Sequence, residues 1–285
     1  MNDLRTRLAA GESVLMPGTW DALSSRLAAD AGFSTVFLSG YCVSGTQLGL
    51  PDYGFLTQTE MADQARRATA ANPGLNVVVD GDTGYGNALN VIRTVELWEA
   101  AGAAGVFIED QVWPKRCGHM SGKQVVPAEE WLPKLRAAVD TRSDLLVCAR
   151  TDARAAIGLD EAIERGKAAV DAGVDAVFVE APESVAEMER IAAEVPAPVL
   201  VANMVEAGKT PLLTPAELTD LGFRLVVSPV TALLAMTSAV RSAFDILASK
   251  GTLRDDLDRL VTFDEFTEIV GLPGIAATEE RYGAG

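Results

Sequence analysis

Several residue types are scarce in this chain, and each scarcity narrows the range of functions. The sequence contains one histidine and three cysteines, with no CxxC pair. Too few ligands remain for a Cys/His zinc site, and the odd number of thiols argues for free cysteines in a reducing compartment rather than a disulfide framework. Aromatic residues make up 6% of a chain that is 48% hydrophobic, which predicts an interior of Ala, Val, Leu and Ile, as in parallel sheets packed under helices.

Positive charge is scarce as well. Lys and Arg number 24 against 40 Asp and Glu, so the net charge is -16, and no basic cluster offsets it. Because attraction to phosphates dominates nonspecific binding to nucleic acids, we predict no nucleic-acid partner. No apolar run approaches the roughly 18 residues of a membrane helix, and the first residues lack the apolar segment of a signal peptide. We therefore expect a cytoplasmic protein with no membrane partner.

Short apolar, β-branched runs bounded by Gly, Asp or Pro recur along the chain. They begin near residues 14, 35, 76, 105, 145, 177, 199 and 224. Amphipathic, Ala-rich stretches of helical period lie between them, for example 127–140 and 159–173. Eight such repeats predict an α/β fold of the (β/α)8 TIM-barrel type, which forms one domain of about 250 residues. We predict a single barrel domain over 1–285, in which 252–285 is a C-terminal helical extension that docks on another subunit.

Polar residues stand at the ends of these runs. They are Ser39, Asp80, Asp82, Glu109, Arg150, Asp152, Glu180, Asn203 and Ser228. Because parallel strands of a closed barrel all point the same way, these side chains are expected to gather on the face that barrel enzymes use for catalysis. The two longest strand-to-helix connections, 41–56 and 110–127, belong to the same face, and connections of that length are often active-site lids.

Carboxylates are concentrated after two of the predicted strands. Asp80 and Asp82 belong to DGDTGYG, and Glu109 ends the next run. Converging carboxylates repel one another unless a cation lies between them, and oxygen ligands favour Mg²⁺ or Mn²⁺. Asp52 can join the water shell of such a metal, or it can be an ordinary turn residue after Pro51. The alternative for Asp80 and Asp82 is that they cap the following turn and helix.

The segment DQVWPKRCGHMSGK, 110–123, places Cys117 in a flexible, polar setting next to the single histidine, His119. A metal ligand, a nucleophile with His119 as its base, a general acid or base, and a loop cysteine without a role are the open interpretations. The general acid or base requires least of the sequence, because Lys115 and Arg116 would lower the pKa of the thiol.

Backbone groups offer a second binding element. Ser39, Gly40 and Tyr41 follow the second predicted strand, where their N–H groups can bind a carboxylate or simply form a turn. The remaining cysteines, Cys42 and Cys148, are interpreted as small buried residues without a role.

Together these motifs resemble the isocitrate lyase and phosphoenolpyruvate mutase superfamily, and the similarity covers essentially the whole chain. The matching segments are SGY and GLPD within 39–52, DGDTGYGN from 80, IEDQVWPKRCGH from 108, ARTDAR from 149, VEAP from 179, NMVEAGKTP from 203 and TLRDDLDRLVTFDEF from 252. As a set they are highly specific.

The resemblance implies a role for each matching position. Asp80 would bind Mg²⁺, and the residues that would hold metal-bound water are Asp52, Asp82 and Glu109. The residues that would bind the substrate carboxylates are Ser39, Gly40, Tyr41, Asp80, Glu180, Asn203, Thr210 and Pro211. Arg150 would steady the oxygen at the cleaved carbon, and Cys117 on a mobile lid would be the general acid or base. The implied catalytic set is Cys117, Arg150, His119, Lys115 and Glu180.

The reaction expected from this resemblance is Mg²⁺-dependent cleavage of the C2–C3 bond of a substituted malate, of the 2,3-dimethylmalate or methylisocitrate type. A homotetramer, a dimer of dimers with exchanged C-terminal helices, is also implied. Oxaloacetate hydrolysis is an alternative, although Pro229 stands where the hydrolases have a serine. Phosphonate mutase chemistry is another, because KRCGH occurs in a carboxyphosphonoenolpyruvate mutase. A barrel retained only as a binding protein would be expected to lack a motif residue, and none is missing.

Overall fold

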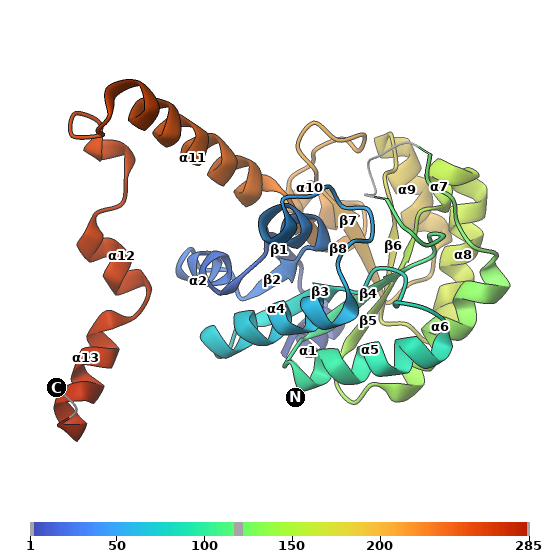
Figure 1. Cartoon of the computed structure of the whole chain (residues 1–285). Helices are drawn as coiled ribbons and strands as arrows, with labels where there is room; N and C mark the ends of the chain where they lie inside the picture. The colour runs from blue at the N-terminus through green and yellow to red at the C-terminus, as the bar shows by residue number, and fades with distance from the viewer. Residues whose placement is uncertain (1–2, 117–121, 284–285) are drawn as a thin grey trace. The chain divides into compact units, whose positions relative to one another are not determined.

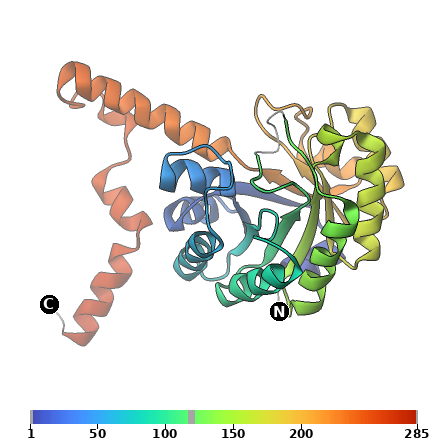
Figure 2. The same ribbon diagram turned by 45° about the vertical axis from the view of Figure 1, so that its right-hand side comes forward.

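The computed structural model describes residues 3–116 and 122–283, and the chain divides into two compact units, Met1–Ala232 and Leu233–Gly285. Eight parallel strands close a barrel in chain order within the first unit, as Figures 1 and 2 show. The strands are β1 (Val14–Thr19), β2 (Thr35–Leu38), β3 (Asn76–Asp80), β4 (Gly105–Glu109), β5 (Leu146–Thr151), β6 (Ala176–Val179), β7 (Val199–Asn203) and β8 (Phe223–Ser228). The predicted (β/α)8 barrel is therefore confirmed, with a strand in each predicted run.

Helices surround the ring of strands in the first unit. They are α1 (Asp3–Ala9), α2 (Ala22–Asp30), α3 (Gly40–Val43), α4 (Gln58–Ala71), α5 (Ala88–Ala100), α6 (Ala128–Thr141), α7 (Ala153–Ala156), α8 (Leu159–Asp171), α9 (Val185–Glu194) and α10 (Pro215–Asp220). Side-chain caps fix where several begin: Thr57 and Glu60 form a capping box at α4, and Thr214 and Glu217 form one at α10.

One connection differs from the sequence-based expectation. The segment 41–56 is not a plain loop, because α3 is followed directly by a π-helical turn, Ser44–Leu48. Ser39 caps α3 by accepting a hydrogen bond from the Cys42 N–H at 3.4 Å. Local capping at a strand end thus converts the start of this connection into helix.

The barrel interior is closed at the amino ends of the strands by α1, whose Leu4 and Leu8 belong to the buried core cluster. Above them, Phe107 contacts Phe37 and Phe178, with ring centroids 5.0 Å and 5.9 Å apart. This aromatic layer forms a floor for the carboxyl-end face, since the guanidinium of Arg150 lies 5.4 Å from the centroid of the Phe178 ring.

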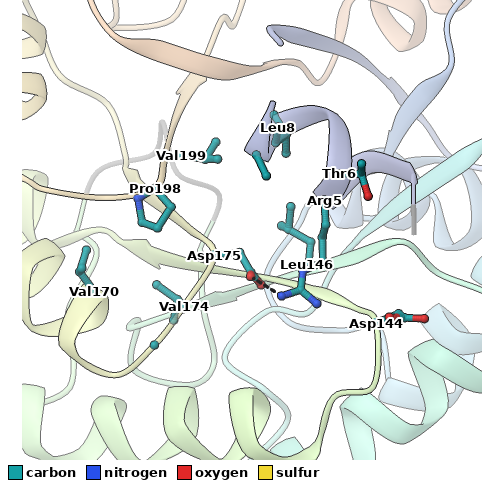
Figure 3. Close-up of a pocket in the computed structure, with 12 residues that line it drawn as sticks. Arg5, Thr6, Leu8, Asp144, Leu146, Val170, Val174, Asp175, Pro198 and Val199 are labelled. Carbon is teal, nitrogen blue, oxygen red and sulfur yellow. Dashed lines mark hydrogen bonds and ion pairs between the residues drawn. The ribbon is translucent and has the colours of Figure 1, made fainter. Parts of the chain in front are cut away.

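A cavity of about 750 Å³ lies at the amino ends of β5 to β7, beside α1 (Figure 3). Asp175 dominates its polar side: it accepts hydrogen bonds from Arg5 at 3.0 Å, from Arg142 at 2.6 Å and from the Val147 N–H at 2.8 Å. The rest of the wall is largely apolar, including Leu146 and Val174. We call it the amino-end cavity.

The second unit is helical. It contains most of α11 (Thr231–Lys250), a short 3-10 turn (Leu257–Arg259), α12 (Phe263–Ile269) and α13 (Leu272–Tyr282). By length and composition, α11 is long and apolar enough to cross a membrane, but a single helix of this kind is weak evidence for a membrane span. Several of its apolar side chains are exposed, including Leu234, Val240 and Phe244. The predicted subunit exchange and single-domain organisation remain predictions.

Candidate active site

Four buried carboxylates gather at the carboxyl ends of β3 and β4, and we call them the acidic cluster. They are Asp52, Asp80, Asp82 and Glu109, with exposed fractions of 7%, 8%, 4% and 3%. Gly40 permits part of this packing: it donates its N–H to Asp80 Oδ2 at 3.3 Å, and a Cβ at this position would lie 2.9 Å from the same oxygen. The other Asp80 oxygen accepts the Asp82 N–H at 3.2 Å.

Lys115 enters the acidic cluster from the 110–127 connection. Its Nζ lies 2.7 Å from both carboxylate oxygens of Asp52 and 2.8 Å from Asp82 Oδ1. Asp52 is therefore directed into the cluster rather than acting only as a turn residue. One ammonium cannot balance four carboxylates, so the cluster has an excess of negative charge.

The pKa values reflect that excess. Burial raises the pKa of Asp82 to about 7; repulsion from Asp80 and Asp52 adds to this, and Lys115 opposes it. Burial also raises the pKa of Glu109 well above its usual range, against the attraction of Arg150. Burial alone would lower the pKa of Lys115, but Asp82 and Asp52 raise it well above its ordinary value. Carboxylates in this state are stabilised by an added cation.

The residues of the acidic cluster fit a magnesium ion that keeps most of its water ligands. Within 3–116 and 122–283, no three Asp, Glu, His or Cys side chains approach closely enough to hold a metal directly. Mg²⁺, however, commonly binds one or two carboxylates and keeps several waters, which other carboxylates then hold. The donors are all oxygens, and Glu109 Oε1 is buried with no hydrogen-bond partner in the described residues.

Arg150, at the end of β5, connects the acidic cluster to the next strands. Its Nε lies 3.5 Å from Glu109, 3.0 Å from Asp152 and 3.7 Å from Glu180. Burial opposes its charge, but Asp152, Glu180 and Glu109 raise its pKa well above the ordinary value, so it remains a guanidinium. A fixed cation thus stands between carboxylates of three strands.

The side of the face formed by β6 and β7 has polar groups that lack partners. Glu180 is fully buried, and Asn203 Nδ2 donates to both of its carboxylate oxygens at 3.4 Å. Asn203 Oδ1 and Thr210 Oγ1 are buried without hydrogen-bond partners in the described part of the chain. Pro211 is partly buried beside Thr210. Such groups are rare in folded proteins unless a ligand or water satisfies them.

The backbone at 39–41 is already engaged by protein atoms. The Ser39 N–H donates to the Thr19 carbonyl at 3.1 Å, and the Gly40 N–H donates to Asp80. Tyr41 is 38% exposed. A substrate carboxylate at this position would have to share the Gly40 N–H with Asp80.

The sequence interpretation missed a second buried lysine on the same face. Lys123 Nζ lies 2.6 Å from Asp152 Oδ1, and Asp152 also accepts hydrogen bonds from Arg150. Lys115 and Lys123 are thus anchored on either side of residues 117–121. Those five residues, which include Cys117 and His119, lie outside the described residues. A lysine on each side of Cys117 was the available signal. Cys42 and Cys148 are buried, as predicted, and form no disulfide within the described residues; Cys42 Sγ donates to the Pro229 carbonyl at 3.2 Å.

The end of β8 carries hydroxyl groups on both sides of Pro229. Ser228 Oγ and Thr231 Oγ1 are 2.6 Å apart, and the Thr231 hydroxyl donates to Glu206 Oε1. Since Thr231 gives its proton to Glu206, the Ser228 hydroxyl donates to Thr231. Both hydroxyls therefore have hydrogen-bond partners within the protein.

A family model described as phosphoenolpyruvate phosphomutase matches residues 4–248 of the chain. The chain belongs to this family. Two relatives are similar over most of their length. The petal death protein of Dianthus caryophyllus is 51% identical over 272 residues, which cover 95% of this chain and 85% of that protein. The 2,3-dimethylmalate lyase of Eubacterium barkeri is 44% identical over 284 residues, which cover 99% of this chain and 98% of that protein.

Solved structures of the family agree with the fold. An oxaloacetate acetylhydrolase in complex with 3,3-difluorooxalacetate has a TM-score of 0.93 at 35% identity and covers 98% of this chain and 96% of that one. A phosphonopyruvate hydrolase in complex with oxalate and Mg²⁺ has a TM-score of 0.88 at 30% identity, covering 98% and 97%. The protein is thus an enzyme of the PEP mutase/isocitrate lyase superfamily, whose members include lyases.

Proposed function

We propose that this protein is an Mg²⁺-dependent lyase that cleaves the C2–C3 bond of a malate substituted at C2 and C3. The observation that supports this most is Arg150, a buried cation held between Glu109 and Glu180 and adjacent to the acidic cluster. The 44% identity to a 2,3-dimethylmalate lyase over nearly the full length of both chains supports the substrate class.

The reaction follows from the bonds that change. The C2 hydroxyl of the substrate gives its proton to a general base of the site, the C2–C3 electron pair stays with C3, and C2 becomes the carbonyl of a 2-oxo acid. The C3 carbanion, stabilised as an enolate of its own carboxylate, then takes a proton and leaves as a carboxylate product. Mg²⁺, when bound by Asp80 and the waters of the acidic cluster, would supply positive charge at the oxygen on C2.

Side chains of the site stabilise charge, bind the second carboxylate and deliver the proton. Arg150 donates to the C2 oxygen as negative charge develops there. The Thr210 hydroxyl, which has no partner among the described residues, donates to the second carboxylate, and Asn203 Nδ2, which already donates to Glu180, is shared with it. The Cys117 thiol delivers the proton to C3, with Lys115 and His119 beside it in the sequence. A segment closing over the site excludes water that would otherwise quench the carbanion.

The first test is product analysis. The purified protein is incubated with Mg²⁺ and, separately, with 2,3-dimethylmalate, 2-ethyl-3-methylmalate, 2-methylisocitrate, isocitrate and oxaloacetate, while 2-oxo acid and oxalate are measured together. A 2-oxo acid from a substituted malate is expected, and chelation of Mg²⁺ should abolish its release. Silence across the whole panel would contradict the proposal and favour a phosphonate mutase, the other activity compatible with KRCGH.

Oxaloacetate hydrolysis is the second candidate, supported by the similarity to an oxaloacetate acetylhydrolase. The end of β8 argues against it. Pro229 has no hydroxyl, and the protons of Ser228 and Thr231 are directed to Thr231 and Glu206 rather than to a ligand. A hydrated carbonyl at C2 would therefore lack a hydroxyl donor on this side.

Pro229→Ser tests that argument directly. The variant is expected to gain oxalate release from oxaloacetate by about tenfold, the effect of one added hydrogen bond to the reacting group, while cleavage of the malate declines. The two products are followed in one assay, with Pro229→Ala as the control that removes the ring without adding a hydroxyl. Efficient oxalate release by the wild-type protein would overturn the interpretation of Pro229.

Quaternary structure is proposed from the family and the helical tail. A homotetramer formed as a dimer of dimers would cover the exposed apolar residues of α11, such as Leu234 and Phe244. Mass measurement in solution distinguishes a tetramer from smaller species.

A further inference from the structure

A second cavity, of about 520 Å³, lies beside the turn that follows β3. Its wall includes Phe55, Tyr85, Trp113, Val126 and Lys134, and no member of the acidic cluster lines it. We call it the Lys134 cavity. Its volume falls within the range of about 300–1,000 Å³ typical of small-molecule sites.

Lys134 is a buried cation that forms no ion pair within the described residues. The buried lysines in the described residues are Lys115, Lys123 and Lys134, and the first two have carboxylate partners at 2.6–2.8 Å. Lys134 is 6% exposed, and its hydrogen bond within the described residues runs to the Thr83 carbonyl at 3.3 Å. Burial lowers its pKa, and the attraction of the exposed Glu130, one helical turn away, only partly offsets this.

Tyr85 contributes its ring to the wall of the same cavity. Its hydroxyl is buried, and the charges of Asp82 and Asp80 act on it, so it lies on the side of the acidic cluster and is not exposed to the cavity. The ring is held between Trp98 and Trp113, at centroid distances of 5.9 Å and 6.3 Å. Tyr85 therefore adds apolar surface to the cavity.

The remaining walls are aromatic and open. Trp113 is 45% exposed and Phe55 is 53% exposed, which is unusual for side chains of this size. The Trp113 indole packs against Gly54, where a Cβ would lie 2.8 Å from the ring. Glycine at 54 thus allows the indole to stand beside the cavity.

We propose that the Lys134 cavity binds a small organic monocarboxylate with an apolar body. The carboxylate would accept a hydrogen bond from Lys134 Nζ and act as its counterion, and the apolar body would pack on Trp113, Phe55 and the Tyr85 ring. A neutral molecule of the same shape leaves the ammonium without a counterion. A dicarboxylate places a second charge against the aromatic wall or the exposed Glu130, so the monocarboxylate is preferred.

The test uses benzoate as the probe, titrated calorimetrically into the full-length protein, with benzamide as its uncharged counterpart. Benzoate is expected to bind one site per chain and benzamide at least about tenfold more weakly, because a hydrogen bond to a charged group contributes that much. Lys134→Met should weaken benzoate by about tenfold or more, and Lys134→Arg, which keeps the charge, should largely retain it. Tyr85→Phe removes a hydroxyl that does not face the cavity and should leave benzoate affinity unchanged.

The active site could also bind a carboxylate, so Arg150→Met, which removes the charge there, serves as the matched control. Benzoate affinity that follows Lys134 and ignores Arg150 supports the proposal. The proposal is overturned if benzoate shows no saturable binding, if Lys134→Met and wild type bind it equally, or if the loss follows Arg150. Thermal unfolding of each variant checks its fold, and the outcome is independent of whether the enzyme is a lyase.

Discussion

The two ends of the barrel differ in how their polar side chains are paired. At the amino end, both Asp175 oxygens are satisfied by Arg5, Arg142 and the Val147 N–H, beside a cavity of about 750 Å³. At the carboxyl end, Glu109 Oε1 and Asn203 Oδ1 are buried without hydrogen-bond partners among the described residues. The amino-end cavity, which is larger than the Lys134 cavity, thus lies beside a carboxylate whose two oxygens both have hydrogen-bond donors. Unpaired buried polar atoms, rather than cavity size, indicate where a ligand belongs.

Cys117→Ser is expected to have the largest effect on activity of the variants that compare the two ends. If the carboxyl end performs the chemistry, turnover should fall by about 10²-fold to 10⁴-fold, because a serine hydroxyl is a much weaker acid than the thiol. Mg²⁺ binding, measured by calorimetry, should be unchanged. Cys148→Ala, which removes a fully buried thiol from the barrel interior, is the control and should keep its turnover. Normal activity in Cys117→Ser would remove Cys117 from the mechanism.

Arg150→Lys tests the guanidinium at the same end. We expect kcat/KM to fall by about 10²-fold, since an ammonium cannot reproduce the planar fork, while the melting temperature changes little. Steady-state kinetics with the best substrate of the panel measures the effect. Arg190→Lys, at an exposed ion pair, should leave kinetics unchanged. A large loss of stability with normal kinetics would make Arg150 a structural residue like Asp175.

Asp175→Asn tests the amino end and should give the reverse result. Removing the charge leaves two arginines without their shared partner, so the free energy of unfolding should fall by about 2 kcal/mol. Urea unfolding measures this, and kcat/KM per folded enzyme should stay within about twofold. Asp171→Asn at the exposed end of α8 is the control, with a change below about 0.5 kcal/mol. A selective loss of activity would contradict the division between the two ends.

The smallest expected effect is a pH dependence of the metal-free protein. The pKa of Asp82 is raised to about 7 in the folded state, above its unfolded value of about 4, so the folded state binds the extra proton. Stability should therefore fall as pH rises from 5 to 7, by about 2 kcal/mol from this group. Comparison with Asp82→Asn isolates the contribution, and added Mg²⁺ should reduce it. Equal pH profiles for variant and wild type would show that Asp82 is ionised throughout.

Much of the fold and part of the candidate site were predictable from local pattern. Short β-branched runs specify strands, and eight of them separated by amphipathic stretches specify a closed parallel barrel. Once the barrel is given, the residues at strand ends must meet, which is why Asp80, Glu109 and Arg150 could be grouped without a structure. The register that pairs Glu109 with Arg150 follows from the same geometry.

The barrel and the polar residues at its strand ends therefore follow from the sequence alone, because the alternation of strand and helix patterns and the direction of each strand are local properties. The tertiary structure alone decided which connections return to those ends. It brought Lys123 to Asp152, directed Asp52 to Lys115, and gave Lys134 no carboxylate partner among the described residues. These contacts join residues that are far apart in the chain, and no local sequence pattern specifies which distant residues will meet.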